Sequence, residues 1–241
     1  MTIPMVCYNY TVTTLNFIYA LLAGLLPSFI WLYFWSREDL LHPEPRALLA
    51  AAFLGGSLAV VAAIFAEKYV GTLVTDISSR YIFWATIEEV AKFASVALVA
   101  LWSKSNDEPI DAMIYCITAA LGFAALENLL FVMGPLSSGN VSVGVLTGNM
   151  RFMGATLVHI VSSALIGFSL GFTFYKPRIV KYTAAIVGIL LASGLHAAFN
   201  LSIISSAASD ALKTFAWIWG ATVILIILFE EVKAVKPRWS S

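Results

Sequence analysis

Apolar residues run through this chain in long blocks that short polar segments separate. A transmembrane helix needs about 20 mainly apolar residues to cross the hydrocarbon core of a bilayer. We therefore predict an all-α, polytopic integral membrane protein with about seven transmembrane helices. The predicted spans are Thr14–Trp35, Ala47–Ala66, Arg80–Trp102, Ile110–Gly134, Asn149–Tyr175, Tyr182–Ser205 and Leu212–Val232.

The segments between these spans are short. Ser36–Arg46 and Ser103–Pro109 are polar and are predicted as loops, and Lys176–Lys181 is predicted as a short basic turn. Glu67–Ser79 is predicted as a loop that includes at most a short interfacial helix. Pro135–Gly148 is rich in Gly and Ser and is predicted as a flexible loop.

The composition agrees with a membrane protein. Hydrophobic residues make up 60% of the chain, charged residues make up 12%, and the mean hydropathy is +0.88. The formal net charge is zero and gives no indication of nucleic-acid binding. The two cysteines, Cys7 and Cys116, do not suggest a disulfide framework, because Cys116 lies in an apolar block. We expect one membrane-embedded domain over residues 1–241, with its functional motifs within residues 80–205.

The distribution of Lys and Arg predicts the orientation, because cytoplasmic loops carry an excess of these residues. With the N-terminus outside, the cytoplasmic segments hold Arg37, Arg46, Lys104, Lys176, Arg178, Lys181, Lys233, Lys236 and Arg238. The outer segments then hold only Lys68, Arg80, Arg151 and Lys213. We therefore predict an outer N-terminus and a cytoplasmic C-terminus.

Three ionisable residues lie together inside the third predicted span. A charge at the bilayer centre costs about 2.5–3.5 kcal/mol on insertion scales, so such residues face partners or a water-filled cavity. Glu88 and Glu89 are adjacent and diverge by about 100° around a helix, whereas Glu88 and Lys92 share a face. We predict a general base among the acids, tuned by Lys92. A structural ion pair between helices is the alternative.

The next three spans carry candidate partners, which are Glu127 with Asn128, then His159, then His196 with Asn200. Glu88, Glu127, His159 and His196 lie seven to nine residues from the predicted outer ends of their spans. At a rise of 1.5 Å per residue, all four lie roughly 10–14 Å below the outer face. We therefore expect the four side chains to line one polar cavity that opens outward.

Several of these residues have more than one possible role. Glu127 is a candidate third acid, a candidate metal ligand, or the counter-charge of Lys92. Arg151 either extends to the outer interface or reaches Glu127 or Glu89. His196 and Asn200 are four residues apart and share a helix face, which suits two oxyanion donors or a His held by an amide.

The motifs occur in the order E-E-x-x-K, G-F-A-x-x-E-N, a His in the next span, and H-x-x-x-N. This ordered set resembles the PrsW family of intramembrane proteases, which is distantly similar to the CAAX prenyl endopeptidases and the bacteriocin-processing membrane proteases. The resemblance runs from about Ile87 to Asn200. The prenyl endopeptidases carry E-E-x-x-x-R, whereas Lys92 lies one position earlier, which argues against prenylated substrates.

The resemblance implies an intramembrane endopeptidase in the prokaryotic plasma membrane. It implies a membrane-anchored protein substrate that is cut near the extracytoplasmic face, as in the first cleavage of an anti-sigma factor. It also implies that Glu88, Glu89 and His159 are the essential acids and His, and that His196 and Asn200 form the last motif.

Two schemes for hydrolysis fit these residues. In the scheme we favour, Glu88, with help from Glu89, activates a water that His159 positions, and His196 and Asn200 stabilise the oxyanion. In the second scheme, zinc is bound by His159, His196 and a Glu such as Glu127, and it lowers the pKa of its water to about 7. The family is usually called a metalloprotease family, although this chain has no H-E-x-x-H motif.

Two other functions remain open from the residues alone. The same buried carboxylates could serve a proton- or cation-coupled transporter, although the sequence shows neither an inverted repeat nor paired broken helices. A catalytically silent membrane scaffold is the third alternative.

Overall fold

The computed structural model describes residues 14–39, 42–205 and 211–237. All regular structure within these residues is helical, so the predicted all-α class is confirmed. Cys7 and Arg238, which the sequence analysis named, lie outside the described residues.

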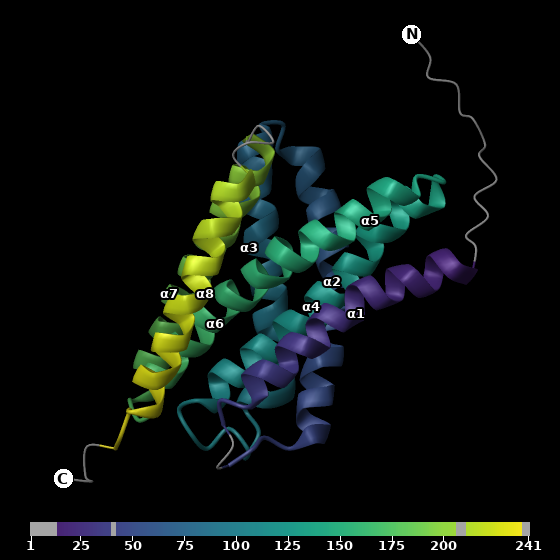
Figure 1. Ribbon diagram of the computed structural model, residues 1–241. Helices are drawn as coiled ribbons and strands as arrows, with labels where there is room; N and C mark the ends of the chain where they lie inside the picture. Colours follow the sequence, from purple (N-terminus) through teal and green to yellow (C-terminus); the bar gives the residue numbers. More distant parts are fainter. Residues whose placement is uncertain (1–13, 40–41, 206–210, 238–241) are drawn as a thin grey trace.

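The described residues form eight α-helices and two short π-helical segments. These are α1 (Thr14–Ser36), α2 (Arg46–Leu73), α3 (Ile77–Val96), η1 (Ala97–Leu101), α4 (Asp111–Ser137), α5 (Val141–Met150), η2 (Arg151–Ala155), α6 (Thr156–Phe172), α7 (Arg178–Ser205) and α8 (Ala211–Lys233). The segments α5, η2 and α6 follow one another without a break and act as one long helix (Figure 1). The helices start at alternating ends of the bundle, with α2, α4 and α7 starting at the lower end in Figure 1 and α3, α5 and α8 at the upper end.

Within the described residues, six segments are long and apolar enough to cross a membrane, namely α1, α2, α4, the α5–α6 segment, α7 and α8. The remaining predicted span forms α3 and η1, but it carries Glu88, Glu89 and Lys92 and is too polar to belong to this group. All three of these side chains are buried inside the bundle. Large apolar side chains such as Leu58 and Phe65 are exposed on the outer helix faces, as suits a lipid-facing surface. The protein is therefore integral to the membrane.

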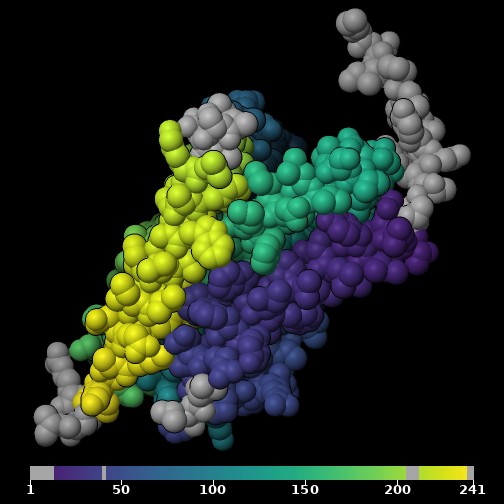
Figure 2. Space-filling view, in the orientation of Figure 1, coloured from purple at the N-terminus to yellow at the C-terminus, as the bar shows by residue number. Residues whose placement is uncertain are grey.

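The central helix of the bundle is α4, which packs against α1, α2 and α6. Residues 111–125 of α4 are buried on every side. A helix that is buried all round is one enclosed by other protein segments rather than by lipid. Figure 2 shows α1 and α5 side by side on one face, flanked by α8, and the rings of Trp31 and Trp219 join α1 to α8 at 6.1 Å between centroids.

Glycines bring α2 and α4 into backbone contact. A Cβ atom on Gly56 would overlap the backbone of Ala119, and a Cβ atom on Gly122 would overlap the backbone of Phe53. Ser57 Oγ donates a hydrogen bond to the carbonyl oxygen of Gly122 at 2.8 Å. Small residues allow such close approach between membrane helices. This contact fixes the position of α2 relative to the residues that α4 carries into the site.

Two segments predicted as loops are helical instead. The helix α2 continues through Glu67 to Leu73, so only residues 74–76 connect it to α3. The predicted flexible loop over Pro135–Gly148 is wrong, because α4 reaches Ser137, α5 begins at Val141, and only residues 138–140 form the turn. The predicted fifth span therefore begins eight residues too late. In a bilayer, backbone groups find no water and pair best within a helix, which overrides the turn preference of Gly and Ser.

Candidate active site

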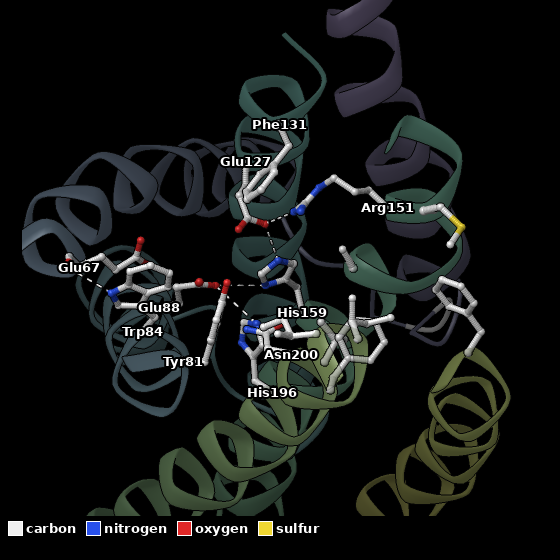
Figure 3. A pocket seen from close by; sticks show the side chains of 17 residues that line it. Glu67, Tyr81, Trp84, Glu88, Glu127, Phe131, Arg151, His159, His196 and Asn200 are labelled. Carbon is white, nitrogen blue, oxygen red and sulfur yellow. Dashed lines mark hydrogen bonds and ion pairs between the residues drawn. The ribbon is translucent and has the colours of Figure 1, made fainter. Parts of the chain in front are cut away.

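Helices from across the bundle bring ionisable side chains to one cavity of about 470 Å³. Glu88 of α3, Glu127 of α4, His159 of α6 and His196 of α7 all line this cavity (Figure 3). The convergence predicted for these four side chains is observed. The further lining residues used below are Glu67 of α2, Arg151 of η2 and Asn200 of α7.

Glu88 is the acid that faces the cavity. Its side chain is buried, with a relative exposure of 7% for the residue. Its Oε2 atom lies 3.9 Å from His159 Nδ1 and 3.7 Å from His196 Nε2. These separations are too long for direct hydrogen bonds, and Oε2 has no hydrogen-bond partner among the described residues. The three atoms therefore leave a gap between them that suits a bound water or an ion.

Glu89 points away from the cavity, as the 100° rotation per residue requires, and is fully buried. Its Oε1 atom accepts hydrogen bonds from Lys92 Nζ at 2.5 Å and from Ser162 Oγ at 2.8 Å. Its Oε2 atom accepts one from Ser163 Oγ at 3.0 Å. Lys92 therefore pairs with Glu89, its i,i+3 neighbour. It does not pair with Glu88, the i,i+4 neighbour that the sequence suggested. Glu89 therefore ties α3 to α6 and does not line the cavity.

The two imidazoles are oriented by carboxylates on their outer sides. His196 Nδ1 lies 2.8 Å from Glu89 Oε1, and His159 Nε2 lies 2.8 Å from Glu127 Oε2. A carboxylate only accepts hydrogen bonds, so the outer nitrogen of each neutral ring carries the proton. The inner nitrogens, His159 Nδ1 and His196 Nε2, then carry lone pairs. The lone pair of His159 Nδ1 accepts a hydrogen bond from Lys92 Nζ at 3.1 Å, and that of His196 Nε2 lies on the side of Glu88.

Glu127 and Asn128 anchor Arg151. The guanidinium of Arg151 donates to Glu127 Oε2 and, through Nε, to Asn128 Oδ1 at 2.5 Å. Asn128 Nδ2 in turn donates to Thr156 Oγ1 at 3.0 Å. Of the alternatives left open by the sequence, Arg151 reaches Glu127 and does not extend to an interface. Arg151 is the first residue of η2, a π-helical segment of a kind that often occurs at functional sites.

The family model described as PrsW family intramembrane metalloprotease matches residues 44–229, which include every residue that lines this cavity. The chain belongs to the PrsW family. The family is one of intramembrane proteases, and therefore of hydrolases, so the resemblance drawn from the ordered motifs is confirmed.

Two relatives, each named Protease PrsW, are similar to this chain. The protein from Geobacillus kaustophilus (strain HTA426) is 28% identical over 159 residues, which cover 65% of each chain, slightly less than two thirds. The protein from Bacillus subtilis (strain 168) is 24% identical over 225 residues, which cover 90% of this chain and 94% of that protein. No solved structure matches the chain.

Because the family is described as one of metalloproteases, we asked which side chains could bind a metal ion. Glu88, His159 and His196 each offer one ligand atom, and these atoms lie within 4.8 Å of one another. Zinc holds nitrogen and carboxylate ligands tetrahedrally at about 2.0–2.2 Å, which places neighbouring ligand atoms roughly 3.3–3.6 Å apart. The unpaired Oε2 atom of Glu88 and the two inner nitrogens fit this spacing after small shifts.

Two features qualify the metal set expected from the sequence. Glu127 was grouped with the two histidines, but it contacts the outer nitrogen of His159 and pairs with Arg151, so Glu88 takes its place in the cluster. Lys92 Nζ lies 3.1 Å from His159 Nδ1, so its ammonium group and a metal ion compete for the same lone pair.

The sequence analysis missed Glu67, which lines the PrsW cavity from α2. Its backbone oxygen accepts a hydrogen bond from Trp84 Nε1 at 3.1 Å. Glu67 was assigned to a loop because it interrupts the apolar pattern after Ala66. The signal that could have found it is the continued apolar run from Tyr69 to Leu73, which extends the helix past Glu67.

Proposed function

We propose that this chain is an endopeptidase that hydrolyses a peptide bond of a membrane-anchored protein. The observation that carries the proposal is the buried, unpaired Oε2 atom of Glu88, which lies between two imidazole nitrogens in a cavity large enough for an extended peptide segment. A buried carboxylate without a hydrogen-bond donor is costly to keep for stability alone. A general base for water needs this kind of free oxygen within reach of its substrate.

The side chains around Glu88 have distinct roles in this proposal. Glu88 takes a proton from a water bound in the gap and passes it to the leaving amine, while the lone pair of His196 Nε2 holds that water by accepting its other proton. His159, whose Nδ1 lone pair accepts from Lys92 Nζ, lines the other side of the gap. A neutral His196 with its proton on Nδ1 cannot also donate to an oxyanion. Asn200, which lines the cavity one helical turn beyond His196, is therefore the neutral donor we assign to the oxyanion.

Glu89 and Lys92 are proposed as positioning residues, not as reacting groups. Glu89 orients His196, and Lys92 links Glu89 to His159. Glu127 orients His159 from the opposite side. Carboxylates that orient metal-binding or catalytic imidazoles in this way fix the tautomer of the ring.

The metal scheme uses the same side chains. Glu88, His159 and His196 would hold a zinc ion, and a bound zinc ion supplies Lewis acidity and lowers the pKa of its water to about 7. With Glu88 as a ligand, Glu67, another acid that lines the cavity, would be the group left to accept a proton.

We further propose that cleavage occurs near the extracytoplasmic face, as in the first cut of an anti-sigma factor. The Lys and Arg asymmetry supports an outer N-terminus, and Glu127 and His196 then lie nearer the outer ends of α4 and α7. The side chains of Glu67 and Tyr81, near the α2–α3 connection, line the cavity toward that end.

Reconstitution of the full chain in liposomes with a panel of single-span peptides tests this function. We expect cleavage that mass spectrometry maps to the peptide bonds at one membrane boundary, with one oxygen of bulk H₂¹⁸O incorporated into the new carboxylate. Metal analysis of the active protein and inhibition by a zinc chelator would identify the metal scheme. Cation flux across the vesicle wall without any cleavage would contradict the proposal and favour a transporter.

A further inference from the structure

A second group of buried acids lies at the other end of the bundle from the proposed active site. Asp39 and Glu44 come from the connection between α1 and α2, and Asp111 begins α4. One carboxylate oxygen from each lies within 4.8 Å of the other two. Their relative exposures are only 6%, 9% and 1%, respectively. Sixteen residues of α4 separate Asp111 from Glu127, which corresponds to about 24 Å along the helix, so the two sites are distinct.

Three oxygens of this acid cluster accept hydrogen bonds from backbone N–H groups or a hydroxyl. Asp111 Oδ2 accepts from the backbone N–H groups of Asp107 at 2.8 Å and Glu108 at 2.7 Å. The hydroxyl of Tyr115 donates to Glu44 Oε2. Asp39 Oδ1 accepts from the backbone N–H of His42 at 3.3 Å.

One oxygen of the cluster is left without a donor. Asp39 Oδ2 is buried and has no hydrogen-bond partner among the described residues. No Lys or Arg within the described ranges forms an ion pair with Asp39, Glu44 or Asp111, and the nearby Lys233 pairs instead with Glu38 and Glu230.

Burial without a cation is unfavourable for these acids. It raises the pKa of Asp39 and raises the pKa of Glu44 to about 8, because the charged forms lose their hydration. Either protons or a bound cation must offset the repulsion among three carboxylates that lie this close together.

We propose that Asp39, Glu44 and Asp111 bind a hard divalent cation such as Mg²⁺ or Ca²⁺. Cations of this class take carboxylate and other oxygen ligands, whereas the proposed active site offers two imidazole nitrogens. A second triad, Asp39, His42 and Glu108, shares Asp39 and has its ligand atoms within 4.8 Å of one another. This triad places an additional carboxylate at the rim of the same site.

The bound cation would join two connections of the chain. It would hold the segment before α2 against the start of α4, the helix at the centre of the bundle. This site stands apart from the proposed protease chemistry, because none of its residues lines the active-site cavity.

Terbium luminescence on the full chain in detergent tests the site directly. Tb³⁺ replaces Ca²⁺ at oxygen sites and emits when a nearby phenol or indole transfers excitation energy, and the Tyr115 hydroxyl contacts Glu44. After treatment with a chelator, we expect saturable Tb³⁺ emission that excess Ca²⁺ or Mg²⁺ displaces. Glu44→Gln and Asp39→Asn should each weaken Tb³⁺ binding at least tenfold. Glu88→Gln in the active site and Glu230→Gln on the exposed end of α8 should leave it unchanged.

Thermal unfolding supplies an independent readout and guards against a misfolded variant. Millimolar Ca²⁺ or Mg²⁺ should raise the Tm of the wild-type protein by at least ~3 °C through linkage to the folded state. In chelator, Glu44→Gln should be as stable as the wild type or more so, because it removes repulsion, and it should lose the shift caused by the cation. The absence of saturable binding to the wild type, or binding and stabilisation that Glu44→Gln leaves intact, would overturn the proposal.

Discussion

Glu88 and Glu89 are neighbours in the chain, but their surroundings suit different tasks. Glu89 accepts hydrogen bonds from an ammonium group and two hydroxyls, and it also contacts an imidazole, so its charge is matched inside the protein. Glu88 keeps one oxygen free within a cavity. A single residue step around a helix therefore separates an oriented, structural carboxylate from the one that we propose as the base.

Lys92→Met tests the structural role of Glu89. The substitution leaves Glu89 without its ammonium partner, and breaking a buried ion pair from one side costs about 3–5 kcal/mol. We expect a large fall in Tm in detergent, whereas Lys68→Met on the exposed face of α2 should change the Tm little. If Lys92→Met is as stable as Lys68→Met, Lys92 does not neutralise Glu89 in the folded protein.

The pH dependence of stability provides a second test at the residue level. Burial raises the pKa of Glu44 from an ordinary value near 4.5 to about 8 in the folded protein. Between these values the folded state binds the proton more tightly than the unfolded state, so stability falls as the pH rises toward 8. In chelator, the Tm should be lower at pH 8 than at pH 6, and Glu44→Gln should reduce that difference by at least half. An unchanged difference would show that other groups, such as Asp39 or Asp111, cause it.

The ionisable residues of the site could be identified from the sequence, because a charged side chain in a bilayer is unfavourable in free energy. Their partners could not be identified in this way. The sequence predicted that Glu88, Glu127, His159 and His196 converge, because each side chain is energetically unfavourable in contact with lipid. It paired Lys92 with Glu88 because these residues are i,i+4 neighbours on one helix face. Glu89 and Lys92, at i,i+3, are also neighbours, and only the packing of α6 against α3 selects Glu89 as the partner. It missed Glu67 for a different reason, since a single acid after an apolar block resembles the end of a span.

Helix boundaries depended on the surroundings more than on local composition. The apolar blocks correctly located seven helical segments, since length and hydropathy are local properties. The Gly- and Ser-rich residues 138–148 were predicted to be flexible, yet α5 occupies residues 141–150. Its Gly144 and Gly148 are buried against α4 and α1, so these glycines serve close packing.

The contact between α2 and α4 predicts opposite effects for two glycines of one helix. A Cβ atom on Gly56 would overlap the α4 backbone, whereas one on Gly71 meets nothing within 4 Å. Gly56→Ala should therefore destabilise the protein by about 1–3 kcal/mol. Gly71→Ala should be neutral or stabilising by up to about 1 kcal/mol, because it restricts the unfolded chain. Equal Tm values for the two variants would contradict the close packing of α2 on α4.

The orientation of the whole molecule is a prediction from the Lys and Arg distribution. In a Cys7→Ser background, a cysteine at Ser138 in the α4–α5 turn should react with an impermeant thiol reagent added to intact cells. A cysteine at Ala234, beyond α8, should react only after the membrane is opened, and the native Cys116 is buried and serves as an internal blank. The reverse pattern would place the α4–α5 turn in the cytoplasm and would contradict cleavage at the outer face.

The single domain predicted over residues 1–241 stays a prediction, although the family match over residues 44–229 spans most of it. Within the described residues, every helix of the match contributes to one bundle around α4. The proposed active site and the proposed cation site lie toward opposite ends of this bundle, so substitutions at one should leave the other intact.

The central claim is that Glu88 performs the chemistry of this site, and its replacement by Gln tests that claim most directly. Glu88→Gln keeps the size of the side chain and removes the base, so the protein should insert and keep a Tm close to that of the wild type. Its rate of cleavage of the best single-span peptide in liposomes should fall by at least about 10²–10⁴-fold, whereas Glu230→Gln should cleave at the wild-type rate. Cleavage by a folded Glu88→Gln variant at the wild-type rate would contradict the account.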